Sequence, residues 1–119
     1  MKKFLAVTMV ALTALAFAGT ASASTAGQRN ALHKARTYLS ISAFSKKGLV
    51  EQLEFDGFSH SDSRWAAAHV RVSWKHQAVK KAKTYLQISS FSKSGLVEQL
   101  EFDGFTHSQA VYGVNKAYH

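Results

Sequence analysis

The sequence contains two copies of one segment, 47 residues apart. The stretch Ala35–Phe58 returns as Ala82–Phe105 with few changes. Between residues 31–61 and residues 78–108, 24 of 31 positions are identical. Chance does not produce such agreement, so both copies must adopt the same fold. Because a unit this short is near the lower limit for folding alone, we expect the copies to pack together or to share a rigid connection.

Each copy shows the pattern of three helices. The first helix carries apolar residues at helical spacing: Ala31, Ala35, Tyr38 and Leu39. A break follows at residues 42–44, after which Ser45 is a good N-cap for a second helix. That helix is expected to end at Gly57, because glycine readily takes the left-handed conformation that ends many helices. Ser59 is the expected N-cap of a third helix.

In the second copy the same roles fall to Ser73, Ser92, Gly104 and Thr106. The chain has no proline, so nothing in its composition interrupts helices. The sequence therefore predicts an all-α fold: two tandem three-helix, helix-turn-helix-like repeats following a signal peptide.

The aromatic residues of each copy are expected to supply much of its core. In the first copy these residues are Tyr38, Phe44, Phe55 and Phe58, each with a counterpart in the second. Gly48 and Gly95 fall inside predicted helices, where glycine costs about 1 kcal/mol relative to alanine. Something is therefore expected to approach their backbone closely. Tight contact between helices is the first explanation, and a partner's backbone is the second.

The amino terminus has the pattern of a cleavable signal peptide. Lys2 and Lys3 precede an uncharged apolar stretch, and residues 21–23 read Ala-Ser-Ala, which fits cleavage after Ala23. We therefore expect a signal peptide at 1–23, one repeat at 24–72 and the other at 73–119. An uncleaved membrane anchor is the weaker alternative, because the apolar stretch is short for a span. After cleavage no transmembrane helix is expected, and the protein would be secreted or associated with the cell surface.

The chain is basic and has no cysteine. Its net charge is +8, and residues 24–119 carry 13 lysines and arginines against 7 acids, a net charge of +6. Such a balance favours anionic partners. The absence of cysteine excludes disulfides, zinc–cysteine sites, thiol catalysis and lipid attachment through cysteine. No cofactor is indicated.

Three other kinds of chemistry find little support in the sequence. The third helices begin with residues 59–64 and 106–111, which are poor in cations, and Asp62 would repel phosphate. We therefore do not expect a nucleic-acid partner. His60 and His107 have no closely spaced ligand beside them, so we interpret them as surface or capping residues and not as metal ligands. No nucleophile elbow or zincin pattern is present, and a chain this small has little room for a deep pocket, so we do not expect an enzyme.

The charges of the second helix run against its dipole. Lys46 and Lys47 lie at its start, whereas Glu54 and Asp56 lie near its end. One hypothesis is that these acids, together with Glu51, face the basic first helices. The alternative is an acidic strip that meets a partner.

Any binding surface is expected on the basic first helices and at the start of each third helix. The candidate partner-binding residues are Lys34, Arg36, His60, Lys80, Lys83 and His107. A protein partner fits such a surface best.

The pattern AxxYLxxxxFSxxGLxxQLxxxGF begins at Ala35 and again at Ala82, and a serine or threonine follows it each time. It resembles the repeat of the host-cell-surface-exposed lipoprotein (Ltp) family, over nearly all of residues 24–119. The resemblance implies tandem helix-turn-helix-like units and a role in superinfection exclusion. In that role, a protein on the surface of a lysogen engages the tail or injection apparatus of an incoming phage and blocks DNA injection.

This sequence departs from the family pattern because it lacks the lipobox cysteine. No lipid anchor is then expected, and charge or a partner would have to retain the protein at the envelope. The alternative function is that of a secreted envelope-binding protein, whose ligand is an anionic wall polymer or a surface protein. A helix-turn-helix DNA-binding protein is the lesser alternative.

Overall fold

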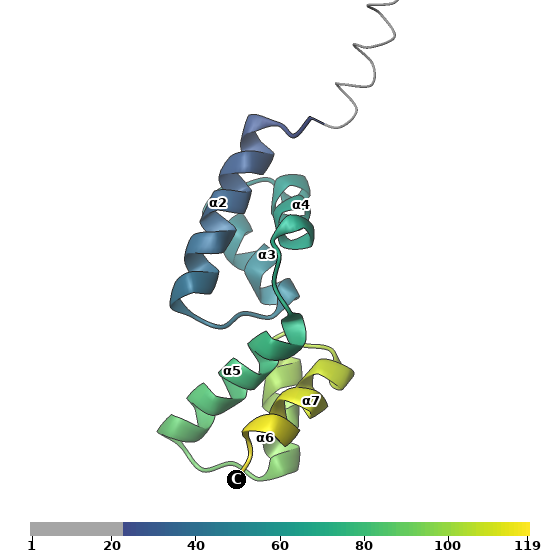
Figure 1. Cartoon of the computed structure of the whole chain (residues 1–119). Coiled ribbons are helices and arrows are strands. Elements are labelled where there is room, and N and C mark those ends of the chain that lie inside the picture. Colours follow the sequence, from purple (N-terminus) through teal and green to yellow (C-terminus); the bar gives the residue numbers. More distant parts are fainter. Residues whose placement is uncertain (1–22) are drawn as a thin grey trace, which may run out of the picture.

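The computed structural model describes residues 23–119, and the predicted signal peptide lies outside them apart from Ala23. The described part contains six helices and no strand (Figure 1). The helices are α2 (Ala26–Ile41), α3 (Lys46–Phe55), α4 (His60–His69), α5 (Trp74–Ile88), α6 (Lys93–Phe102) and α7 (His107–Ala117). The predicted all-α fold with three helices in each copy is confirmed.

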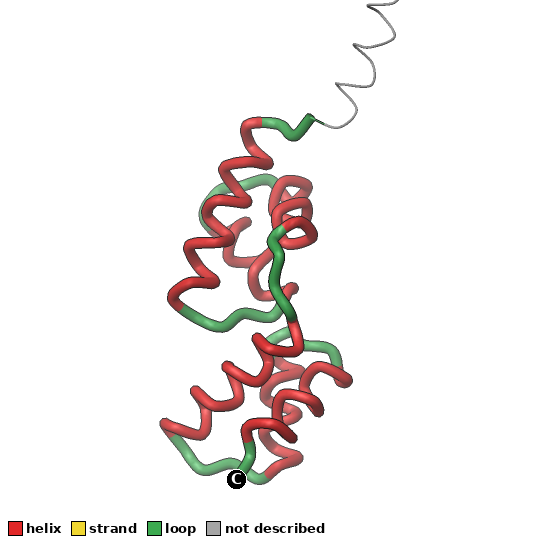
Figure 2. The backbone as a smooth tube through the Cα atoms, in the orientation of Figure 1, coloured by secondary structure: helices red, strands yellow, loops and turns green. Residues whose placement is uncertain are grey.

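The helices form two similar units that follow one another end to end (Figure 1). In each unit the third helix packs against the first and second helices, α4 on α2 and α3, and α7 on α5 and α6. A short extended segment after α4 leads into α5 (Figure 2). Among the described residues, no helix combines the length and the apolar composition needed to cross a membrane.

Every described helix begins at a hydroxyl residue. Its side-chain oxygen accepts a hydrogen bond from the backbone N–H three residues later, which satisfies one donor that the helix itself leaves free. The caps are Thr25, Ser45, Ser59, Ser73, Ser92 and Thr106. Helices α3 and α6 end before Gly57 and Gly104, whose φ angles are +102° and +105°. The predicted caps and terminating glycines are thus confirmed.

The explanation predicted for Gly48 and Gly95, tight contact between helices, is wrong for Gly95 and only a part of the reason for Gly48. A Cβ atom on Gly48 would lie 3.5 Å from the backbone carbonyl of Asp103, at the end of α6, whereas no other helix comes within 4 Å of one on Gly95. Each glycine donates its N–H to the capping serine, at 2.8 Å from Ser45 Oγ and 2.9 Å from Ser92 Oγ. A Cβ atom would lie only 2.9 Å and 2.8 Å from the same two oxygens. Glycine therefore leaves room for the cap hydroxyl.

The tight contact between helices occurs at Gly113. A Cβ atom at this position of α7 would lie 2.7 Å from the carbonyl carbon of Ala78 on α5 and 2.8 Å from its carbonyl oxygen. The first repeat has Ala66 at the equivalent place in α4. Helix α7 thus rests directly on the backbone of α5.

Each repeat has its own core, built around two leucines of its second helix. Leu49 and Leu53 are fully buried in the first repeat, as are Leu96 and Leu100 in the second. Buried alanines of the flanking helices surround them. Small residues in these positions let the helices approach closely, so the leucines fill the space between them.

Phe55 and its counterpart Phe102 are not part of the core, contrary to expectation. They are 85% and 86% exposed. Each follows the second buried leucine by two positions, which is about 200° around a helix, so it points away from the face that the leucines bury. The other predicted core aromatics are confirmed at least in part: Phe105 is buried, and Tyr38, Phe44 and Phe58 pack against the core while half-buried.

The two repeats also contact each other, as expected for units this small. Ser45 Oγ donates to the carbonyl oxygen of Asp103 at 2.6 Å, and the N–H of Phe44 donates to Oε1 of the buried Gln77 at 3.1 Å. A Cβ atom on Gly104 would lie 2.6 Å from Ser45 Oγ. The turn after α6 is therefore seated on the start of α3.

We predict that Gly113→Ala destabilises the protein by about 1–3 kcal/mol, because the new methyl group must displace the α5 backbone. This loss opposes the gain of about 1 kcal/mol that alanine brings to a helix. The free energy of unfolding in urea measures the difference. Asn115→Ala, at an exposed position of the same helix, is the control and should be neutral or slightly stabilising. A Gly113→Ala variant as stable as this control would refute the close contact.

Candidate partner-binding surface

The two repeats expose the same pair of large apolar side chains. Ile41 and Phe55 are 74% and 85% exposed, and their counterparts Ile88 and Phe102 are 73% and 86% exposed. Ile41 and Ile88 end the first helix of their repeats, and the phenylalanines end the second. Single exposed apolar residues are common on proteins, but large aromatic side chains open to water are typical anchors of protein interfaces. Each repeat therefore presents the same two exposed apolar side chains, at the ends of its first and second helices, as candidate contact residues.

A hydrogen-bonded lock holds the helix end that carries each phenylalanine. Tyr38 Oη on α2 donates to Oδ2 of Asp56 at 2.5 Å, and Gln52 Nε2 donates to Tyr38 Oη at 3.3 Å. In the second repeat, Tyr85 Oη donates to Asp103 Oδ2 at 2.6 Å. Because Asp56 directly follows Phe55, this lock ties the helix end that carries Phe55 to the first helix.

The same locks shift the acidity of both tyrosines. The hydrogen bond to Asp56, followed by burial, raises the pKa of Tyr38 above its usual value. Burial, followed by the hydrogen bond to Asp103, raises the pKa of Tyr85 to about 12. Both effects favour the neutral phenol, because burial disfavours the charged phenolate and the carboxylate accepts a hydrogen bond only from the protonated form.

The acids of the second helix do not pair with the basic first helices as hypothesised. Glu54 is hydrogen-bonded to His60 at the start of α4, and Glu101 is hydrogen-bonded to His107. Asp56 does meet the first helix, but through a tyrosine and not through a lysine. Glu51 is exposed. The histidine pairs therefore link the second helix of each repeat to the third.

Several cations lie over aromatic rings. Lys34 Nζ lies 5.5 Å from the ring centre of Tyr38, and Lys81 lies 5.7 Å from that of Tyr85. Lys75 lies 5.2 Å from the ring of Tyr112. Such contacts stabilise exposed pairs by about 0.5–1 kcal/mol. These lysines cover the tyrosines while their charge stays available to solvent.

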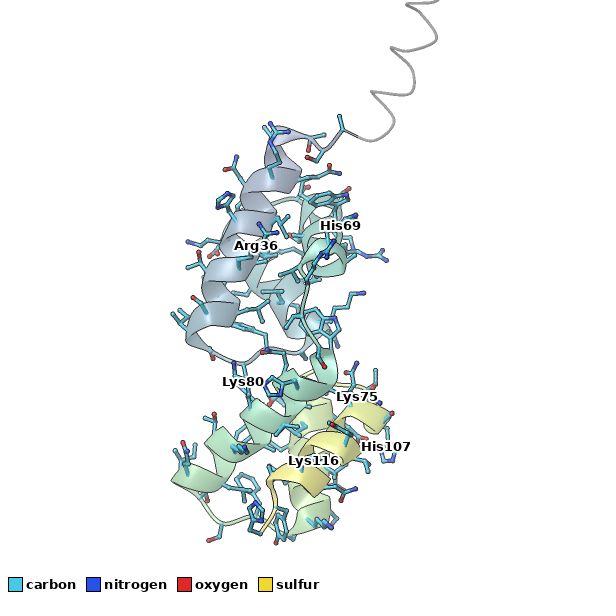
Figure 3. All side chains as sticks on the ribbon, in the orientation of Figure 1. Arg36, His69, Lys75, Lys80, His107 and Lys116 are labelled. Carbon is cyan, nitrogen blue, oxygen red and sulfur yellow. The ribbon has the colours of Figure 1, made fainter. Side chains whose placement is uncertain are left out.

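The six candidate residues from the sequence do not form one cluster. Lys34 covers Tyr38, whereas His60 and His107 are each paired with a glutamate. Arg36 on α2 and Lys80 on α5 belong to different repeats (Figure 3). Lys80 and Lys83 are exposed. Their role in binding stays a prediction.

The described residues offer no arrangement of three or more histidines and carboxylates that could hold a metal ion. Sequence reasoning missed the four exposed apolar residues. The spacing between Phe55 and the two leucines could have identified Phe55 as exposed, because this spacing places its ring on the opposite side of the helix.

These features define a class: all-α proteins built from tandem three-helix units with their own cores. Within it, the chain belongs to the family described as host cell surface-exposed lipoprotein, whose model matches residues 27–70 and again residues 73–116. No match was found among curated proteins.

A solved structure is also similar: that of Ltp, a superinfection exclusion protein from the Streptococcus thermophilus temperate phage TP-J34. The two share 35% sequence identity, and the TM-score is 0.73. The match covers 78% of this chain and 97% of that chain. The resemblance seen in the repeat pattern is thereby confirmed.

We predict that the double substitution Phe55→Ser and Phe102→Ser leaves the free energy of unfolding within about 0.5 kcal/mol of the wild type, because both rings are exposed. Leu53→Ala is the contrasting variant and should cost about 2–5 kcal/mol, since it opens a cavity in the core. Urea unfolding measures both. Destabilisation of the serine variant to the extent seen for Leu53→Ala would show that the rings are packed after all.

A second prediction concerns alkaline pH. The folded-state pKa of Tyr85 is about 12, above its ordinary value of 10.0, so the neutral phenol stabilises the fold below pH 10.0. This contribution should be lost as the pH rises from 10.0 through about 12. The Tyr85→Phe variant should therefore lose less stability than the wild type over that range in urea unfolding. Equal losses of stability in the two proteins would contradict the raised pKa of Tyr85.

Proposed function

We propose that this protein excludes superinfecting phage. Outside the cytoplasm it binds a protein of the tail or injection apparatus of an incoming particle, and it blocks DNA entry without catalysing a reaction. The observation that carries the proposal is the similarity to Ltp, which is described as a superinfection exclusion protein and is matched over 97% of its solved chain. The family description places its members at the host cell surface.

The surface of the protein supports binding to another protein. Each repeat holds an exposed phenylalanine at a locked helix end, in Phe55 and Phe102. A phenylalanine side chain has only two rotatable bonds and therefore loses little conformational entropy when a partner covers it, so it suits this role. Two such anchors on one chain allow two contacts with a partner that repeats along its length.

Exposure outside the membrane is part of the proposal. It is supported by the pattern of a cleavable signal peptide and by the family description. Since the chain has no cysteine, retention near the membrane would depend on its net charge of +6 over residues 24–119 or on a protein partner. Anionic polymers of a cell envelope attract such a charge at low salt.

The same charge favours a second candidate, an envelope-binding protein without a role against phage. Its ligand would be an anionic wall polymer or a surface protein. Salt-sensitive retention of the purified protein on isolated cell walls, together with unimpaired plaque formation, would support this candidate. DNA binding is less favoured, because the start of α4 carries Asp62 and its His60 is engaged with a glutamate.

We predict that expression in a sensitive host lowers plaque number while adsorption of the phage stays normal and its DNA fails to enter. The Phe55→Ser and Phe102→Ser double variant should lose most of this protection, because it lacks both aromatic anchors. A matched control is Gln87→Ser on the exposed part of α5, which should protect like the wild type.

The measurements are plaque counts, residual free phage and phage DNA inside the cells, at equal protein levels confirmed by immunoblot. Unimpaired plaque formation with the wild-type protein, on phages related to TP-J34, would remove the proposal. If protection instead results from lost adsorption of the phage, the protein would act by masking the phage receptor and not by blocking DNA entry.

A further inference from the structure

A groove runs along the junction between the two repeats. It encloses ≈ 630 Å³, and its lining includes Lys46, Lys47, Val50, Arg64, Thr106 and Gln109. The first four come from α3 and α4, and the last two from the start of α7. A second depression of ≈ 690 Å³ shares Lys46, Val50 and Arg64 and extends to Trp65. Together they form one continuous feature, the inter-repeat groove.

The groove exists because the repeats are joined in one particular way. The turn after α6 rests on the start of α3, where Ser45 Oγ donates to the Asp103 carbonyl. Figure 2 shows the loop after α2, the connection into α5 and this turn gathered where the two units meet. Gly104 lines the groove, and a Cβ atom there would lie 3.0 Å from Lys47 Cβ. The first repeat alone lines the depression that reaches Trp65, whereas the part at the junction also needs Gly104, Thr106 and Gln109 of the second repeat.

Positive charge in the groove is unpaired within the described residues. Among the described residues, the close contacts between basic side chains and carboxylates are the two histidine–glutamate pairs, of which only His60–Glu54 lines the groove. Lys46, Lys47 and Arg64 therefore have no carboxylate within ion-pair distance. Glu54 also lines the groove, but His60 is its partner. Glu51 is the remaining acid. Three exposed cations thus face one groove with a single free carboxylate.

The second repeat lacks two of these cations. Lys47 and Arg64 correspond to Ser94 and Val111, whereas Lys46 corresponds to Lys93. The two copies match closely elsewhere, but here the extra charge is confined to the first copy, which supplies most of the groove's lining. This difference is not needed for the fold, because the second repeat forms the same three helices without it.

We propose that the inter-repeat groove binds an acidic segment of a partner protein. Carboxylates of that segment would meet Lys46, Lys47 and Arg64, and its apolar side chains would cover Val50 and Trp65. The inference deepens the proposed function and rests on it for the kind of partner.

A protein segment fits better than a nucleic acid. Glu51 and Glu54 line the same groove. A nucleic acid carries a negative phosphate at every nucleotide, and these two carboxylates would repel the phosphates next to them. A peptide can place a neutral side chain opposite each of these acids.

The test measures fluorescence anisotropy of a labelled synthetic peptide in which glutamates alternate with leucine and alanine. The purified protein should bind this peptide in preference to the same peptide with glutamine for glutamate, and in preference to a short DNA duplex. The Lys47→Glu and Arg64→Glu double variant should weaken binding about tenfold or more. The control is Lys93→Glu with Arg71→Glu, two exposed residues outside the groove that make the same change of net charge, and it should alter binding less than about twofold.

A thermal unfolding curve checks that each variant folds. If the glutamate variant does not fold, Lys47→Ser with Arg64→Val replaces it, because these are the residues that the second repeat carries at the same positions. This variant should weaken binding as well. The inference would be overturned if the groove and control variants weaken binding equally, or if the wild type does not bind the peptide. It would also be overturned if the groove binds the DNA duplex more tightly than the peptide.

Plaque assays with the same variants separate this inference from the proposed function. If the wild type protects cells and the groove variant protects equally well, the groove inference fails and the proposed function stands. If the wild type does not protect but the groove still selects the acidic peptide, the proposed function fails and the groove stands as a peptide-binding site.

Discussion

Each repeat depends on the burial of two leucines that lie four residues apart on its short second helix. Leu49 and Leu53 have no exposed surface, and small residues of the first and third helices close around them. Fully burying a side chain of this size stabilises by about 1.5–3 kcal/mol, a large share of what so small a unit can gain. Their burial sets the rotation of the helix. It thereby decides that Phe55, two residues on, points into solvent.

The joint between the repeats adds a second constraint. Ser45 caps α3 through the N–H of Gly48 and also donates its hydroxyl proton to the carbonyl of Asp103. One side chain thus both starts a helix and holds the neighbouring repeat. The tyrosine lock on Asp103 links the same turn back to α5. A duplicated unit becomes in this way one protein with a surface that neither copy has by itself.

Local features were predictable from the sequence, because short-range chemistry determines them. A hydroxyl residue before an apolar helical pattern and a glycine after it predict helix ends whatever the tertiary structure, and Ser45 and Gly57 are examples. The repeat itself predicted a duplicated fold. The capping role shared by Gly48 and Gly95 is also local, but the cost of glycine in a helix suggested a tertiary contact, which only Gly48 has.

The remaining features depend on rotation and placement in three dimensions. Phe55 was assigned to the core from its residue type, although its position on the helix opposes the leucines. The close contact at Gly113 could not be predicted, since its counterpart Ala66 is also small and no sequence pattern marks a contact with another helix. The inter-repeat groove could not be predicted, because it needs the relative placement of the copies. Comparison of the two copies nevertheless marks the groove, because the first copy has Lys47 and Arg64 where the second has Ser94 and Val111.

The central claim is that the exposed phenylalanines of this fold contact a protein of an incoming phage. A photo-crosslinking amino acid placed at position 55 or 102 tests it most directly, in cells challenged with phage, with position 87 as an exposed control. The account predicts adducts from positions 55 and 102 to a protein that mass spectrometry identifies as part of the phage particle, and none from position 87. Adducts only to components of the host envelope, or equal adducts from all three positions, would contradict it.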